Sequence, residues 1–232
     1  IWSHIKVVHA NDTRASIAAN SVTAGNRSAR EAYLSSLTSM DPLVDFADTL
    51  PVNNEWEPRG QNGNLRQQAQ FTIAAFKAGV SITADLTQGG FDSHQDNDLE
   101  QTTSLTDLTD GVDYLWEAAE AAGIADRLVV IIGSDFSRTP YYNSAQGKDH
   151  HAVGSFIVME KGVSFTNQVI NGSDEGQNAI KIDTQTFQPS GFGTKLVTSH
   201  VHSALRDYLG LAGSDNDLVF PLKNEVKFNF LG

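Results

Sequence analysis

The chain has 232 residues, of which 40% are hydrophobic and 19% charged, as is typical of a globular protein that buries a substantial core. Its formal net charge of −12 argues against nucleic acid or an anionic membrane as a partner, because both attract basic surfaces. The chain has no cysteine, which excludes disulfides, thiolate metal ligands and thiol nucleophiles, and no apolar run approaches the roughly 20 residues of a membrane span.

The first part of the chain predicts few regular elements. The chain opens on Ile1 rather than methionine, so we expect an upstream portion to have been removed or to belong to a longer protein. Residues 1–27 contain one short apolar run, IKVVHA, which predicts a strand followed by a loop. Residues 28–50 are mostly helical in pattern, with an interruption near Pro42, and PVNNEWEPRGQNGN (51–64) predicts an exposed linker.

A regular alternation of helices and strands follows this linker. Apolar residues recur at helical spacing in three segments, each followed by a glycine where a C-terminal cap would stand. Three other segments are short apolar runs, which favour strands. In chain order the predicted elements are a helix over 65–76, a strand over 80–86, a helix over 105–122, strands over 128–133 and 156–160, and a helix over 197–209.

This order of elements predicts an α/β fold with a mostly parallel central sheet flanked by helices. We expect residues 63–232 to form this core and residues 1–62 to form an N-terminal strand and helical segment with its linker, within one domain overall. Ligands of such sheets gather at the carboxyl ends of the strands. The polar stretch FDSHQDND follows one predicted strand and SDFSRTP follows the next, so both are expected at this edge.

Three polar clusters in these loops carry the residue types of a metal site. Each cluster alone has an ordinary explanation, because aspartate often caps helices and histidine is common in loops. Three such clusters in order at strand ends favour a site for zinc, manganese or iron, and less well for calcium, because the set mixes oxygen and nitrogen donors. The clusters are Asp92 with His94, Asp135 in GSDFSRTP, and Asp149 with His150 and His151 in GKDHHAVGS.

Two features near these clusters have competing interpretations. The run DSHQDNDLE alternates acidic and amide groups but lacks the glycine and final glutamate of a helix-loop-helix calcium site. Asp96 and Asp98 are therefore expected to be solvated or to cap the next helix, with a surface calcium as the alternative. Arg138 offers two parallel donors to an anionic phosphate or sulfate, and a structural salt bridge is the equal alternative.

The motifs GGFDSH, GSDFSRTP and KDHHAVGS resemble the signature of the secreted bacterial family known as domain of unknown function 1501. Its members typically show Gly-Gly-Phe/Trp-Asp-Thr-His, then Ser-Asp/Glu-Phe-Gly-Arg-Thr, then Gly-Thr-Asp-His. The resemblance covers about residues 60–210. That family is assigned to the alkaline-phosphatase-like superfamily, which implies a mostly parallel sheet between helices, two metals at the strand ends, and a periplasmic or extracellular location.

The resemblance also implies roles for individual residues. It places Asp92 and His94 at a first metal, Asp135 at a second, and His150 as the later ligand of the first, with His151 as its alternative. Asp149 and His202 are expected to form hydrogen bonds around these ligands. Phe136 stands where the superfamily has a histidine, which weakens the second metal site.

The expected nucleophile is missing. The superfamily has a Ser or Thr nucleophile after its opening strand. The segment after IKVVHA matches this pattern poorly, with Asn11, Asp12 and Thr13. The chain is therefore expected to lack the first strand and to be a carboxyl-terminal part, with an upstream fragment or a second copy as partner.

Two functions follow from these features. One is a metal-dependent hydrolase of small phosphate or sulfate esters that uses zinc, or alternatively manganese, iron or calcium, with a water or an absent serine as nucleophile. The other is a non-catalytic descendant that serves in binding or assembly.

Overall fold

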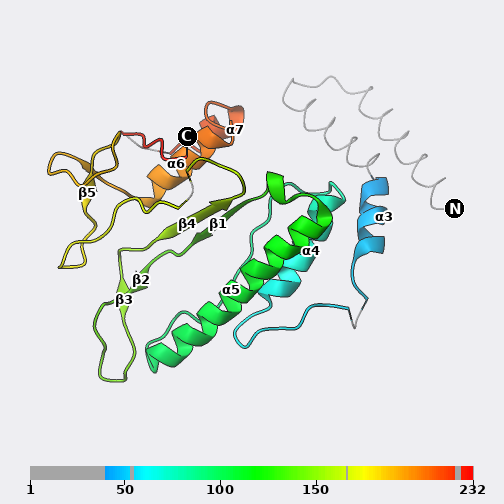
Figure 1. Cartoon of the computed structure of the whole chain (residues 1–232), viewed down its shortest axis with the longest axis horizontal. Helices are drawn as coiled ribbons and strands as arrows, with labels where there is room; N and C mark the ends of the chain where they lie inside the picture. Colours follow the sequence, from blue (N-terminus) through cyan, green and yellow to red (C-terminus); the bar gives the residue numbers. More distant parts are fainter. Residues whose placement is uncertain (1–39, 53–54, 166, 223–225, 232) are drawn as a thin grey trace, which may run out of the picture. The chain divides into compact units, whose positions relative to one another are not determined.

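The structure is a computed structural model that describes most of the chain after residue 39 (Figure 1). The strand expected in IKVVHA and the first part of the helix expected over 28–50 lie outside the described residues. The described residues are 40–52, 55–165, 167–222 and 226–231.

The chain divides into two compact units. The first comprises Ile1–Phe91 and Gln101–Ile124, and the second comprises Asp92–Glu100 and Ala125–Gly232. Every residue expected at the metal site belongs to the second unit. The predicted division of the chain near residue 62 stays a prediction.

Among its described residues, the first unit has three helices: α3 (Met40–Thr49), α4 (Leu65–Lys77) and most of α5 (Asn97–Ala122). Helix α4 confirms the prediction over 65–76, and the buried residues Leu65, Ala69 and Ile73 follow the helical period. Gly79 has a φ of +71°, which glycine adopts at little cost, and its N–H donates to the Phe76 carbonyl. The predicted glycine cap is therefore confirmed.

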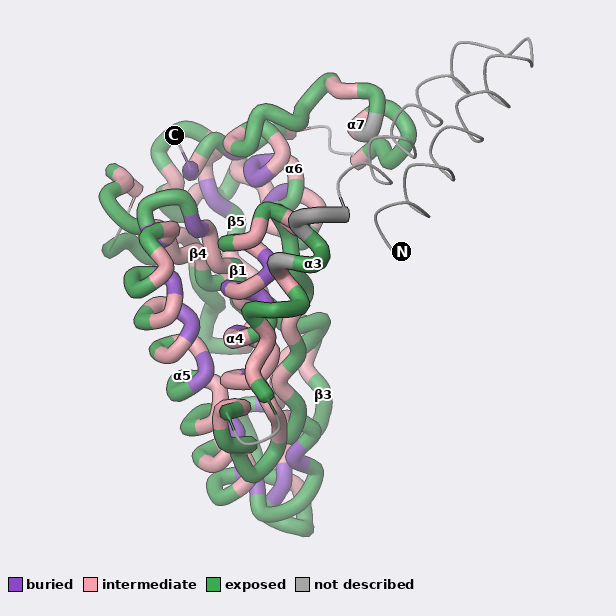
Figure 2. Tube along the Cα trace, turned by 90° about the vertical axis from the view of Figure 1, so that its right-hand side faces the viewer, coloured by how far each residue is buried: buried purple, intermediate pink, exposed green. Residues whose placement is uncertain are grey.

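Helix α5 was predicted over 105–122 and begins earlier, at Asn97. Figure 2 shows buried and half-buried segments alternating with exposed ones along this helix. Gly111 allows close packing, because a Cβ at that position would lie 2.6 Å from the Leu65 side chain of α4. Arg66 adds an ion pair to Asp110 at 2.9 Å, so both apolar and charged contacts join the two helices. The buried residues of α5 within the first unit include Ser104, Gly111, Leu115 and Ala119.

The sheet structure of the second unit corrects the predicted fold. The described residues contain three two-stranded sheets, and all three are antiparallel. The prediction of a mostly parallel central sheet flanked by helices is therefore wrong. The pairs are β1 (Val129–Gly133) with β4 (Phe156–Glu160), β2 (Ser137–Arg138) with β3 (His150–His151), and β5 (Lys181–Ile182) with β6 (Thr194–Lys195).

The error lies in the pairing more than in the strands themselves. The strands predicted over 128–133 and 156–160 are confirmed as β1 and β4, but a short apolar run does not specify the direction of its partner. Neither strand is covered on both faces, since Ile131 of β1 is 42% exposed and Ile157 of β4 is 53% exposed. The strand predicted over 80–86 does not form, and Ile82 within it is 92% exposed.

Helix α6 (Thr198–Tyr208) confirms the helix predicted over 197–209, with Gly210 at a φ of +68° after it. Its buried face packs with Leu231 against two side chains of β4, Phe156 and Val158. The short elements η1 (Ala125–Arg127) and α7 (Asp215–Val219) complete the described structure. Among the described residues, we found no helix with the length and apolar character that crossing a bilayer requires.

Candidate metal centre

Two loops of the second unit form the base of the candidate site. Residues 92–97 lie against residues 145–148 and are joined to them by three backbone hydrogen bonds. Gly147 sits so close that a Cβ there would lie 1.8 Å from the His94 carbonyl oxygen. Only glycine fits without a shift of the backbone. The bonds run from Lys148 N to Ser93 O (2.9 Å), from Asn97 N to Gln146 O (3.0 Å) and from Asp96 N to Ala145 O (3.3 Å).

The β2–β3 pair determines which of the two adjacent histidines joins the site. Arg138 lies opposite His150, and Ser137 lies opposite His151. Successive side chains of a strand point to opposite faces, so the two imidazoles diverge. His150 approaches the loop of residues 92–97, whereas His151 places its Nε2 2.9 Å from the Gln177 carbonyl oxygen.

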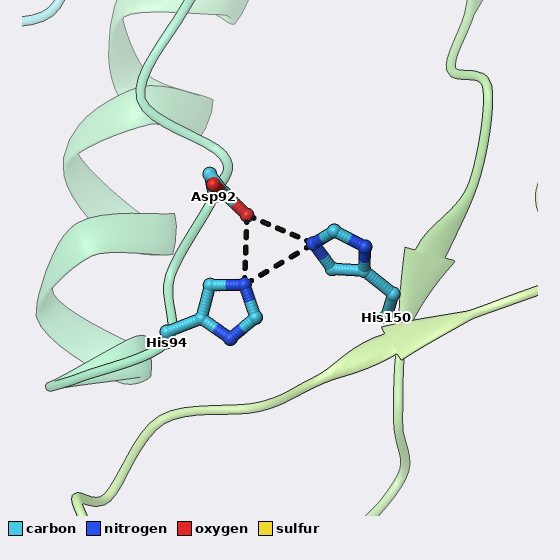
Figure 3. Close-up of side chains that lie close together, drawn as sticks. All are labelled: Asp92, His94 and His150. Atoms are coloured by element: carbon cyan, nitrogen blue, oxygen red, sulfur yellow. Dashed lines mark hydrogen bonds and ion pairs between the residues drawn. The ribbon is translucent and has the colours of Figure 1, made fainter.

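Three side chains meet in a compact triangle of donor atoms (Figure 3). Asp92 Oδ1 lies 3.2 Å from His94 Nε2 and 3.1 Å from His150 Nε2, and the two nitrogens are 3.1 Å apart. A tetrahedral ion with bonds of about 2.0–2.1 Å separates its ligand atoms by about 3.3–3.4 Å, so a shift of roughly 0.2 Å would fit one. The side chains are 74%, 46% and 53% exposed in chain order, which leaves the triangle open to solvent.

The ring of His94 is held from its other side. Its Nδ1 lies 3.2 Å from Asp149 Oδ1, and Asn143 Nδ2 donates to the same oxygen at 3.2 Å. The bond from Asn143, followed by that from His94, lowers the pKa of Asp149, which therefore stays ionised. A carboxylate at Nδ1 assigns the proton to that nitrogen and leaves the Nε2 lone pair directed into the triangle.

Arg138 also contacts the triangle, with a side chain that is only 13% exposed. Its Nη2 donates to Asp92 Oδ1 at 2.5 Å, and its Nη1 donates to the Lys148 carbonyl at 3.1 Å and lies 3.5 Å from His94 Nε2. The bond from Arg138, and then that from His150, lowers the pKa of Asp92. The guanidinium thus forms the salt bridge that was one of its two predicted roles.

Phe136 has a contact that its sequence position did not predict. Its ring stacks on that of His150, with centroids 4.1 Å apart and an angle of 27° between the planes. The Arg138 guanidinium carbon lies 5.5 Å from the same ring centroid. Phe136 therefore limits how the His150 ring can turn.

Besides His151, two of the expected site residues lie outside this group. Asp135 is exposed and does not belong to the group of ligand atoms found among the described residues. His202 is exposed and packs edge-on against Phe156 at 6.3 Å. Its neighbour on α6, His200, is 7% exposed and accepts a hydrogen bond from Val197 N at 3.2 Å. Burial lowers the pKa of His200.

Asn143 and Gly147 were not singled out from the sequence, although both contact the site. Both fall in NSAQG, a stretch of small and polar residues that indicates a loop and nothing more. Their contacts depend on which distant segment the loop packs against. Local composition carries no such information.

Comparison with known proteins identifies the family. Residues 12–163 match the family described as Protein of unknown function (DUF1501), while no curated protein and no solved structure matches the chain. The motifs indicated residues 60–210, whereas the match both begins and ends earlier in the chain. It contains Asp92, His94 and His150. It covers more than half of the chain. The chain therefore belongs to the DUF1501 family, as the motifs predicted.

Proposed function

We propose that the chain binds one divalent transition-metal ion through Asp92, His94 and His150, with zinc as the preferred ion. The observation that carries this proposal is the triangle of one carboxylate oxygen and two imidazole nitrogens, with sides of 3.1–3.2 Å. Such a donor set also suits manganese and iron. It does not suit calcium, which takes 6–8 oxygen ligands.

The finer proposal is that this ion serves in the hydrolysis of a small phosphate or sulfate ester. Three protein ligands and an exposed triangle leave room for water or substrate, which is typical of catalytic and not structural zinc sites. An ion of this kind acts as a Lewis acid and brings the pKa of a bound water to near 7. The chain itself supplies a guanidinium beside the ligands, since Arg138 lies within 3.5 Å of both Asp92 and His94 atoms.

The alternative is a non-catalytic protein that keeps this network for binding or assembly. It is favoured by the Arg138 bond to Asp92 Oδ1, the same oxygen that faces both histidines. The Arg138 guanidinium therefore already neutralises the Asp92 carboxylate. The alkaline-phosphatase-like assignment and the periplasmic or extracellular location stay predictions, and neither proposed function depends on a parallel sheet.

Metal binding is tested by comparing two adjacent residues. The metal-stripped chain and the variants His150→Ala and His151→Ala are titrated with Zn²⁺ by calorimetry. We expect one ion per wild-type chain, and loss of His150 should weaken binding by more than about 100-fold, because even outer partners of ligands are worth 10–100-fold. His151→Ala should bind as wild type, since the His151 ring faces Gln177. Equal losses in both variants would contradict the assignment.

Activity is tested next on aryl phosphate and aryl sulfate esters, with and without added Zn²⁺. The hydrolase proposal expects turnover that requires the ion and disappears in Asp92→Ala. Turnover that survives this substitution would rule out the site. Arg138→Met distinguishes the two functions. If Arg138 binds the ester, turnover should fall in Arg138→Met. In the non-catalytic alternative, where Arg138 only neutralises Asp92, no variant should show turnover, and Arg138→Met should bind Zn²⁺ more tightly because the competing guanidinium is gone.

A further inference from the structure

Asn143 connects the metal-binding loop to the loop that carries Asp149. Its side-chain amide nitrogen donates to two acceptors, the His94 carbonyl oxygen at 3.1 Å and Asp149 Oδ1 at 3.2 Å. Asp149 Oδ1 in turn lies 3.2 Å from His94 Nδ1. One amide group therefore holds both ends of His94, its main chain directly and its ring through the carboxylate.

The orientation of this amide is fixed by its oxygen. Asn143 Oδ1 accepts from Ala145 N at 2.9 Å and from Gly147 N at 3.0 Å. A flipped amide would set its NH₂ group against these two N–H donors and its oxygen against two acceptors. All four hydrogen bonds of the side chain are thus made in one orientation only, and Asn143 is half-buried while it makes them.

We propose that Asn143 is a positioning residue for the metal centre, which it serves by fixing Asp149 and thereby the ring of His94. This inference rests on the proposed metal function. It assigns a role to a residue that touches none of the three donor atoms of the triangle. Outer partners of this type set the tautomer and direction of an imidazole ligand, and their loss weakens metal binding.

The substitution Asn143→Asp separates positioning from loop closure. The new carboxylate still accepts from Ala145 N and Gly147 N, so the turn keeps its two hydrogen bonds. Its second oxygen replaces the NH₂ group and faces Asp149 Oδ1 and the His94 carbonyl, both of which are acceptors. Repulsion between the two carboxylates should drive Asp149 away from His94.

Asn178→Asp is the matched control in the same unit. Asn178 also donates its amide nitrogen to a carboxylate, Asp174 Oδ1, at 3.3 Å, and this pair involves none of the three ligands. The same chemical change therefore removes the same kind of bond without affecting His94. Thermal unfolding of each metal-free variant shows whether the chain still folds.

The experiment is a titration of the full, metal-stripped chain with Co²⁺, followed by its visible absorption. We expect Asn143→Asp to weaken Co²⁺ binding by about 10- to 100-fold and to change the absorption bands, because the ligand geometry changes. Asn178→Asp should match wild type in both. If Asn143→Asp binds Co²⁺ with wild-type affinity and an unchanged spectrum, the positioning role is wrong while the metal site stands. If the wild-type chain binds no Co²⁺, the proposed function itself fails.

A second variant keeps the test decisive if Asn143→Asp alone does not fold. Asp149→Asn alone keeps an oxygen that accepts from both Asn143 Nδ2 and His94 Nδ1, as Asp149 Oδ1 does. In Asn143→Asp/Asp149→Asn the amide at residue 149 donates to the carboxylate at residue 143 and no longer serves both partners with one oxygen. We therefore expect the double variant to bind Co²⁺ more weakly than Asp149→Asn. If the two bind Co²⁺ equally well, Asn143 does not act through residue 149 and the proposal is overturned.

Discussion

Helix α6 and the loops of the candidate metal centre belong to the same compact unit, but different forces hold each of them in place. On α6, Val201, Ala204 and Leu205 are buried with Leu231 and contact other apolar side chains. In the loops, the side chains of Asp92 and His150 are more than half exposed, and hydrogen bonds between particular atoms hold the segments together. Burial is non-directional and stabilises the fold, whereas the loop contacts fix directions of donor atoms.

The α6 core and the loops should therefore control different properties, stability in the first case and metal affinity in the second. Substitutions in the α6 core should change the free energy of unfolding and leave metal affinity in the folded protein unaltered. Substitutions in the loops should change metal affinity by more than their effect on unfolding predicts. Four measurements test this separation.

The largest effect on stability is expected for Leu205→Ala. Leu205 is 5% exposed in the α6 core, and removal of a buried leucine side chain costs about 2–5 kcal/mol of unfolding free energy through lost burial and the cavity left behind. Urea unfolding measures this loss. Leu209→Ala, at a residue that is 52% exposed at the end of the same helix, should change stability far less. Similar losses for both variants would show that the α6 face is not buried as described.

Among these four substitutions, Gly147→Ala should cause the second-largest loss of stability and the largest loss of metal affinity. The added Cβ would lie 1.8 Å from the His94 carbonyl oxygen, so the two loops must separate, at a cost of about 1–3 kcal/mol. Displacement of His94 should also weaken Zn²⁺ binding by at least about 10-fold. The control is Gly191→Ala, where nothing lies within 4 Å of the added Cβ. If Gly147→Ala binds Zn²⁺ normally, the loop contact does not position His94.

His200 predicts a pH dependence that is confined to the α6 region. Burial lowers its pKa from the usual value of 6.5, so the folded protein resists protonation more than the unfolded chain does. The stability contributed by neutral His200 is therefore fully present above pH of about 6.5 and is lost as the pH falls through the lower, folded pKa, at a slope of at most about 1.4 kcal/mol per pH unit.

The test is urea unfolding of the wild type and His200→Asn between pH 7.5 and pH 5, conditions that span the usual histidine pKa of about 6.5. The asparagine keeps an acceptor for Val197 N but cannot titrate, so its stability should fall less over this range. Parallel curves for the two proteins would contradict a depressed pKa at this position.

The smallest effect is expected for Lys227→Ala. Lys227 Nζ pairs with Asp207 at 3.0 Å, but its side chain is 66% exposed, and exposed ion pairs contribute about 0–1 kcal/mol. Arg206→Ala should cost more, because Arg206 is 26% exposed and also donates to the Phe220 carbonyl oxygen. Unfolding in low and high salt would show the difference. A larger loss at Lys227 would reverse the order that burial predicts.

The helices of this chain were predictable because their signals are local. Apolar spacing located α4 and α6, and the glycines at 79, 123 and 210 all adopt positive φ after a helix. The pairing of strands was not predictable, because it depends on residues far apart in sequence. The apolar run of β1 is the same whether its partner is parallel or antiparallel.

The candidate site divides in a similar way. The sequence identified the types of residue that gather, and the structure brings Asp92, His94 and His150 together while leaving Asp135 and His151 outside. Motif order alone could not make this selection, since it depends on strand register. Nor could it reveal Asn143, whose contacts arise only when two loops pack.

Register has a further consequence for the two neighbouring histidines. A slip of β3 by one position relative to β2 would turn His151 toward Asp92 and send His150 toward Gln177, because the side chains of a strand alternate. Both arrangements carry an imidazole into the same place. A slip by one position in this two-residue pair therefore still leaves an imidazole nitrogen beside Asp92.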